Sequence, residues 1–314
     1  MEKPVTVDVI IPTYKPDKKF YRLIEMLRIQ TYPIDRIIIM NTEKKYFPEG
    51  DWEEFAQIEI HHIAKAEFDH GGTRNTGAGY SRSDIIVFMT QDAVPGDEYL
   101  VERLIAPLKK DYQKKENKAA VSYARQVPET DCNYLESFTR MFNYPKEDKR
   151  KTKEDLDKMG IKTFFCSNVC AAYCRDIFLS LGGFSKKTIF NEDMIFAGHA
   201  IQAGYAVAYT AKAKVVHSHN YSNIQQFHRN FDLAVSQTDN PDVFAGIRSE
   251  GEGIRLVKQT VKYLTDHKKG YLIPSLFLKS GFKYAGFWLG KHYRRLPKFI
   301  IRYCTMNQSY WEDL

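Results

Sequence analysis

The stretch IIVFMTQDAVP, residues 85–95, places five apolar residues directly before a short polar sequence that contains Asp92. An uninterrupted apolar run of this length is typical of a strand that is buried on both faces of a parallel sheet. In open α/β sheets, ligands bind beyond the carboxyl ends of such strands. Asp92 is therefore expected at the ligand-binding edge of a sheet, although an Asp before Ala-Val-Pro-Gly also suits an ordinary turn.

The segments around this stretch alternate between strand and helix patterns. Strand patterns occur at VTVDVIIPTY (5–14), DRIIIMNT (35–42) and IEIHHIA (58–64), and KKFYRLIEMLRIQ (18–30) has apolar residues at helical spacing. Strands that alternate with helices predict parallel βαβ units. We therefore expect an α/β fold with a mostly parallel central sheet that is flanked by helices.

The composition narrows the class of protein. The chain has 314 residues, a length that suffices for one large α/β domain with an appendage or for two modest domains. Its net charge is +7. Most of the basic excess lies near the C-terminus and is mixed with aromatic residues, so nucleic-acid binding is the least favoured interpretation. Five cysteines without an apolar leader predict free thiols in the cytoplasm, and no apolar run is long enough to span a bilayer.

Two pairs of polar residues are candidates for chemistry. Glu192 and Asp193 precede an apolar helical pattern. Acids there commonly stabilise the helix dipole, by about 0.3–1 kcal/mol each, but a carboxylate so placed also serves as a general base. His217 and His219 lie two residues apart at the end of a predicted strand, so we expect them on one face. Such histidines are often structural, yet with an Asp they suit a divalent metal ion.

The segment FDHGGTRNTGA, residues 68–78, is a candidate phosphate-binding turn. Gly71 and Gly72 predict a tight turn, and the helix after it would present free N–H groups. Arg74 is able to pair with a phosphate. The spacing excludes both a P-loop and the dinucleotide fingerprint. Cys166, Cys170 and Cys174 are spaced by four, without the closer pairs of a thiolate metal site, and are expected in the core.

Several of these segments resemble, in their order, the family-two glycosyltransferases of GT-A fold, and most closely their bacterial rhamnosyltransferase branch. The segments are VIIPTYK, HGGTRNTGA, VFMTQDAVP, FFCSNVCAAYCRDIFLSLGGF, NEDMIFAGHAIQAGY and VVHSHNYS, and the resemblance covers residues 5–235. It implies a Rossmann-like GT-A catalytic domain over residues 1–225 and a C-terminal helical region over residues 226–314.

The resemblance also implies roles for individual residues. Asp92 would hold Mg²⁺ or Mn²⁺ against the donor diphosphate, with His217 or His219 as a further ligand, and Asp193 would be the catalytic base beside Glu192. The donor nucleotide would contact Pro12, Thr13, Tyr14, Asn41, Arg74, Gln91 and Asp92. Ser167 and Asn168 are expected to contact the acceptor or to be satisfied strand residues. Two departures stand out: Gln91-Asp92-Ala93 has one carboxylate where the family motif has two, and Asn41 replaces a usual Asp.

The reaction that follows from the resemblance is an inverting sugar transfer. The donor would be dTDP-L-rhamnose and the acceptor a hydroxyl of a lipid-linked bacterial surface polysaccharide. The alternatives are a glycosyltransferase that uses a UDP-hexose, a nucleotidyltransferase, and a non-catalytic subunit of a glycan assembly complex. A nucleotidyltransferase would need a Gly-rich basic loop after the first strand, and PTYKPDKK (12–19) fits that poorly.

The C-terminal region combines basic and aromatic residues. Between Lys262 and Arg302, ten residues are Lys or Arg, and Asp266 is the only acid. Such a pattern is typical of a helix that lies in the membrane interface, where each basic residue contributes roughly 1 kcal/mol near an anionic leaflet. We expect peripheral binding to the inner face of the cell membrane. The alternatives are a helical cap on the catalytic domain and a homo-oligomer contact.

Overall fold

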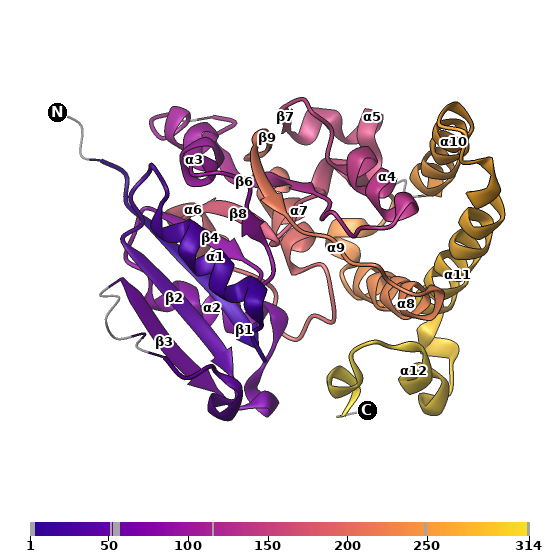
Figure 1. The fold of residues 1–314 in the computed structure, drawn as a ribbon, viewed down its shortest axis with the longest axis horizontal. Helices are drawn as coiled ribbons and strands as arrows, with labels where there is room; N and C mark the ends of the chain where they lie inside the picture. The colour runs from indigo at the N-terminus through magenta and orange to yellow at the C-terminus, as the bar shows by residue number, and fades with distance from the viewer. Residues whose placement is uncertain (1–3, 51, 53–56, 115, 248–249, 313–314) are drawn as a thin grey trace. The chain divides into compact units, whose positions relative to one another are not determined.

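The computed structural model describes residues 4–50, 52, 57–114, 116–247 and 250–312. Within them the chain forms two compact units, which Figure 1 shows. The first consists of residues 1–129, 144–186 and 192–217, and the second of residues 130–143, 187–191 and 218–314. The boundary predicted at residue 225 falls inside a helix of the second unit, Asn223–Asp239.

A central sheet forms the first unit. Its strands are β1 (Val7–Tyr14), β2 (Arg36–Thr42), β3 (Ile58–Ile63), β4 (Ile85–Met89), β5 (Val94–Pro95), β6 (Ala119–Val127), β7 (Lys149–Lys151), β8 (Cys170–Cys174) and β9 (Ala206–Val216). Their order is β3-β2-β1-β4-β8-β6-β9-β5, and β7 pairs with β9. Strands β1 to β4 are parallel, whereas β8 runs antiparallel between β4 and β6. The predicted α/β fold is confirmed, and the buried run 85–89 is strand β4 at its centre.

Helices cover both faces of this sheet. They are α1 (Lys18–Arg28), α2 (His70–Tyr80), α3 (Leu100–Lys110), α6 (Arg175–Ser180) and α7 (Glu192–Gln202), and the same unit contains the short helix α5 (Leu156–Met159). Alternate residues of β1, such as Val9 and Ile11, share a core with the apolar faces of α1 and α3. Ile10 points to the other face, where a Cβ at Gly77 of α2 would lie 2.7 Å from it. The glycine lets α2 pack closely on the sheet.

The predicted tight turn at Gly71 and Gly72 is wrong, because both residues lie in the first turn of α2. The side chain of Asp69 caps this helix by accepting the N–H of Gly72. A Cβ at Gly71 would collide with the backbone carbonyl of Ser185. The glycine is therefore needed for the close approach of two segments and not for a turn.

The charged segment 145–160 contains strand β7, whose Lys151 is buried, and the short helix α5. The segment before the histidine pair is one strand, β9, and His217 follows it. The prediction that Cys166, Cys170 and Cys174 are core residues is confirmed, since all three are buried free thiols.

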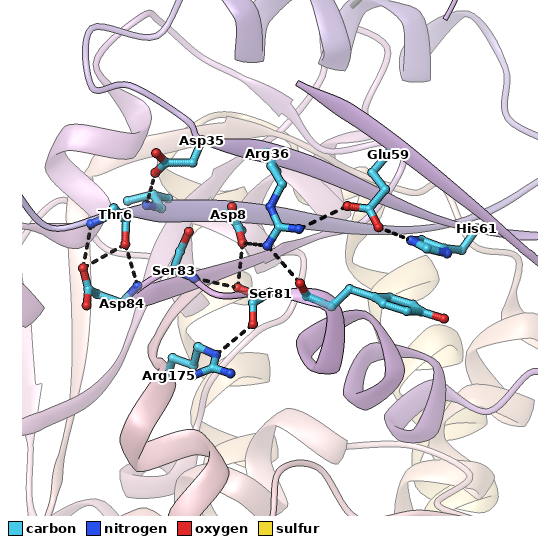
Figure 2. Close-up of polar contacts among 12 residues, drawn as sticks. Thr6, Asp8, Asp35, Arg36, Glu59, His61, Ser81, Ser83, Asp84 and Arg175 are labelled. Carbon is cyan, nitrogen blue, oxygen red and sulfur yellow. Dashed lines mark hydrogen bonds and ion pairs between the residues drawn. The ribbon is translucent and has the colours of Figure 1, made fainter. Parts of the chain in front are cut away.

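A polar network ties together the amino ends of the strands, at the edge opposite the candidate site (Figure 2). Arg36 of β2 forms ion pairs with Asp8 of β1 at 2.9 Å and with Glu59 of β3 at 3.2 Å. Ser81 donates to the same Asp8 carboxylate, which is fully buried. Because a buried charge is costly without partners, this network fixes the register of three strands.

The second unit is helical. Its helices are α4 (Tyr134–Asn143), α8 (Asn223–Asp239), α9 (Pro241–Phe244), α10 (Glu250–Asp266), α11 (Ile273–Lys291) and α12 (Lys298–Cys304). Helix α11 packs closely on α8, because a Cβ at Gly286 or Gly290 would collide with carbonyl oxygens of α8. Among the described residues, no helix has both the length and the hydropathy that crossing a membrane requires.

Candidate active site

Asp92 and His217 lie together at the carboxyl ends of β4 and β9. His217 Nε2 is 3.4 Å from Asp92 Oδ2, and the histidine is buried while the carboxylate is partly open. Asp92 therefore lies beside His217, one of the two histidines that the sequence analysis grouped with it as metal ligands. His219 follows two residues later, belongs to the second unit, and stays a predicted ligand.

Gln126 of β6 fixes the orientation of this histidine. Its Nε2 donates to the hydroxyls of Tyr144 and Ser167, so its Oε1 must be the atom that faces His217 Nδ1 at 3.1 Å. Nδ1 then carries a proton and donates it to Gln126, and Nε2 is the ring atom that faces Asp92.

A histidine nitrogen and a carboxylate oxygen so close together suit a shared cation, which would bind the deprotonated form of Nε2. A histidine nitrogen and a carboxylate oxygen are both ligands of borderline divalent ions, and metal-binding histidines commonly donate their other nitrogen to a neighbouring acceptor. The residues present therefore fit a divalent metal ion. Sequence reasoning missed Gln126, although it is a polar residue near the carboxyl end of an apolar strand, like Asp92.

Glu192 and Asp193 begin α7 and are held in different ways. The Asp193 carboxylate accepts backbone N–H groups from Asn168 at 2.9 Å and from Met194 at 2.8 Å. Glu192 Oε1 accepts from the Asn168 side chain at 3.1 Å and forms an ion pair with Arg74 at 3.3 Å. Both acids are thus fixed by one asparagine, and among the residues that the structure describes only Glu192 of the two forms an ion pair.

The different surroundings separate the pKa values of the two acids. Burial, followed by the charge of Glu192, raises the pKa of Asp193 to about 7. Burial also opposes ionisation of Glu192, but Arg74, His70 and Asn168 outweigh it and lower its pKa. A pair of neighbouring acids with separated pKa values is typical of acid–base sites. Asp193 is therefore suited to take up a proton near neutral pH.

Residues 167–169 connect the two halves of the site. The N–H of Thr90, just after β4, donates to the carbonyl of Val169 at 3.2 Å. The Ser167 hydroxyl accepts from Gln126 on the side of His217, whereas Asn168 binds the two acids. This short segment before β8 brings the Asp92–His217 pair and the Asp193–Glu192 pair to the same sheet edge.

The side chains of Asn168 and Arg74 are buried and bind other protein groups. Both polar atoms of the buried Asn168 side chain have protein partners, since its Oδ1 accepts from Tyr173 at 2.7 Å. The Arg74 side chain donates to the carbonyl of His70 at 2.8 Å in addition to its ion pair with Glu192. These contacts indicate that both residues position the acid pair. Their predicted contacts with acceptor and donor stay predictions.

The predicted donor residues lie near the carboxyl ends of β1, β2 and β4. Gln91 holds Tyr14 by two bonds, because its Oε1 accepts from the Tyr14 N–H at 2.8 Å and its Nε2 donates to the Tyr14 carbonyl at 3.1 Å. Pro12 precedes them in β1 and is partly exposed. Thr13 donates to Asn41 at 3.1 Å, and Asn41 is fully buried.

Aromatic side chains extend this edge. The rings of Tyr14 and Tyr46 meet edge to face at 5.7 Å, and Lys15 Nζ lies 4.5 Å from the centre of the Tyr46 ring. Tyr46 and Lys15 were missed by the sequence reasoning. An aromatic residue shortly after the second strand was the available signal.

The chain matches the model of glycosyl transferase family 2 over residues 8–182. It is 36% identical over 312 residues to the O-antigen chain rhamnosyltransferase RfbN of Salmonella typhimurium, covering 98% of this chain and 96% of that protein. It is 43% identical over 256 residues to the O-antigen chain rhamnosyltransferase WbaN of Salmonella anatum, covering 80% of this chain and 78% of that protein.

Solved structures resemble the chain in fold. The mannosyltransferase PcManGT from Pyrobaculum calidifontis, in complex with GDP-Man and Mn²⁺, superposes with a TM-score of 0.54 at 14% identity and covers 99% of this chain and 86% of its own. S. aureus TarS 1–349 superposes with a TM-score of 0.50 at 11% identity and covers 92% of this chain and 91% of its own.

Proposed function

Because this chain belongs to glycosyl transferase family 2, we propose that it transfers L-rhamnose from dTDP-L-rhamnose to a hydroxyl of a growing, lipid-linked O-antigen chain. The observation that carries the proposal is the identity of 36% and 43%, over most of the chain, to two O-antigen chain rhamnosyltransferases. A UDP-hexose is the alternative donor.

The proposed chemistry uses the two halves of the site. Asp92 and His217 would hold Mg²⁺ or Mn²⁺, which when bound offsets charge on the leaving diphosphate. Tyr14, Gln91 and their neighbours would bind the nucleotide. Asp193, ionised, accepts the proton of the acceptor hydroxyl as that oxygen bonds to the anomeric carbon. The bond from this carbon to the diphosphate breaks on the opposite side, so the configuration inverts.

The acid pair supports the role of Asp193. A base whose pKa is about 7 is ionised often enough to accept a proton at neutral pH, yet is more basic than an ordinary carboxylate. Ser167 and Glu192, beside it, are proposed to orient the acceptor, and Asn168 to hold the acids.

We also propose that residues 226–314 hold the enzyme on the inner face of the cell membrane, where a lipid-linked acceptor is found. Support comes from α11, whose most exposed large side chains are uncharged: Phe277, Leu278, Tyr284 and Trp288 are each more than half exposed. Residues 267–311 contain no Asp or Glu. An anionic leaflet attracts this segment, whereas a second copy would repel it.

A panel of nucleotide sugars tests the proposed reaction. Purified protein is incubated with dTDP-L-rhamnose or UDP-hexoses, together with a short soluble glycan acceptor and Mn²⁺, and transfer is measured. We expect transfer from the thymidine donor, and a kcat lower by a factor on the order of 10²–10⁴ in Asp193→Asn, with donor binding retained. A preference for a UDP-hexose would reject the donor, and full turnover by the variant would reject the base.

A further inference from the structure

A group of basic side chains surrounds one buried carboxylate in the helical unit. Glu136 of α4 is buried and accepts from Lys279 Nζ of α11 at 2.6 Å and from Gln226 Nε2 of α8 at 3.1 Å. The same Glu136 oxygen serves both bonds. This acid is therefore already engaged by one lysine and one amide.

Two more cations belong to the same region. Arg229 follows Gln226 by three residues on α8, and Lys283 follows Lys279 by four on α11, so each lies one turn along its helix. Neither Arg229 nor Lys283 has an ion-pair partner in the part of the chain that the structure describes. The guanidinium of Arg229 lies over the ring of Phe190, 4.5 Å from its centre. Both side chains are half-buried.

The electrostatics of Lys283 reflect this excess of positive charge. Burial lowers its pKa, Glu136 opposes that effect, and the charges of Lys279, Arg229 and Arg140 lower it further. Taking Arg229, Lys279 and Lys283 against Glu136 alone leaves an excess of two positive charges. A half-buried excess of this kind is costly without an anion, because little water screens it.

We propose that Arg229, Lys279 and Lys283 form a binding site for a phosphate-bearing anion, namely the diphosphate or phosphate group that joins a glycan acceptor to its lipid. An arginine fork and lysine ammonium groups match phosphate oxygens. The assignment to a lipid headgroup rests on the proposed function, and it gains support from the exposed apolar side chains of the same helix α11. The anion site itself rests only on the charges and contacts within the helical unit.

Thermal unfolding of the full chain tests the site without using activity. Inorganic pyrophosphate is compared with sodium chloride at equal ionic strength, in wild type, Lys283→Met and the control Lys262→Met, an exposed lysine of α10. We expect pyrophosphate to raise the Tm of wild type and control by more than that of Lys283→Met, which keeps the diphosphate position proposed in the active site. In the absence of pyrophosphate, Lys283→Met should unfold no lower than wild type, since it removes an unpaired charge.

An equal Tm shift in Lys283→Met, or none in wild type, would overturn the site. If Lys283→Met fails to fold, Arg229→Gln serves the same comparison. Geranyl diphosphate, a water-soluble lipid diphosphate, then distinguishes the source of the anion. Tighter binding than that of pyrophosphate supports a lipid headgroup, whereas equal binding rejects the lipid assignment. Transfer to an acceptor that lacks phosphate is expected to be unchanged in Lys283→Met. A negative result for the anion site therefore leaves the proposed sugar transfer untouched, and the transfer assay tests that reaction by itself.

Discussion

Replacing Glu192 by Gln should move the pH dependence of transfer toward acid. The substitution keeps an oxygen that accepts from the Asn168 side chain, now at 3.1 Å, but removes the negative charge beside Asp193. It also leaves the positive charge of Arg74 without its carboxylate partner. Both changes favour the ionised form of Asp193, so the pKa of this acid must fall.

The size of the shift follows from the two causes of the raised pKa. The pKa of Asp193 rises from its ordinary 3.8 to about 7, and burial, which the variant retains, is the larger cause. Glu192 is the second cause, and the N–H groups of Asn168 and Met194 together with the charge of Arg74 oppose both. We therefore expect a fall on the order of one unit, worth about 1.4 kcal/mol. A base with a lower pKa is also weaker, so the plateau rate should fall.

The assay measures kcat and kcat/KM from about pH 5 to pH 9. In wild type the base is protonated at low pH, so activity should rise with pH through a midpoint near 7. In Glu192→Gln the midpoint should lie near 6, whereas the exposed control Glu102→Gln should keep the wild-type midpoint. A midpoint that stays near 7 in Glu192→Gln, or moves to higher pH, would refute the reasoning.

Three other outcomes are expected. Asp92→Asn should abolish stimulation by Mn²⁺ in metal-titration assays, and full wild-type activity in EDTA would contradict the metal site. Arg36→Met should lower the free energy of unfolding in urea by about 3 kcal/mol, because Asp8 stays buried without its cation; an unchanged midpoint would argue against that network. Phe277→Ser with Trp288→Ser should weaken sedimentation with anionic vesicles, unlike the exposed control Ile254→Ser.

The sequence predicted those parts of the site that depend on local patterns. Asp92 follows an uninterrupted apolar run, and Asp193 precedes an apolar helical pattern, so the place of each at an element boundary is visible in a few neighbouring residues. Parallel strands then bring such boundaries to one edge. The resemblance to a known family supplied the roles, and the fold and family are confirmed.

Local sequence patterns did not predict the contacts between segments that are distant in the sequence. The need for glycine at position 71 comes from the carbonyl of Ser185, and the orientation of His217 comes from Gln126 on a neighbouring strand. Helix α11 illustrates the same limit. Its lysines were counted with the basic surface, but the close packing of Gly286 on α8 turns Lys279 inward to Glu136 and leaves aromatic side chains outside.

The pairing of Gln91 with Tyr14 gives a physical reason for the single carboxylate of the metal motif. Position 91 both accepts from the Tyr14 N–H and donates to the Tyr14 carbonyl, and so joins the ends of β1 and β4. An amide is able to do both, whereas an ionised carboxylate only accepts. An acid at position 91 would leave the Tyr14 carbonyl without its donor and place a negative charge beside it. A second ligand of the proposed metal ion would then come from elsewhere, and His217, held by Gln126 with its Nε2 toward Asp92, is suitably placed to supply it.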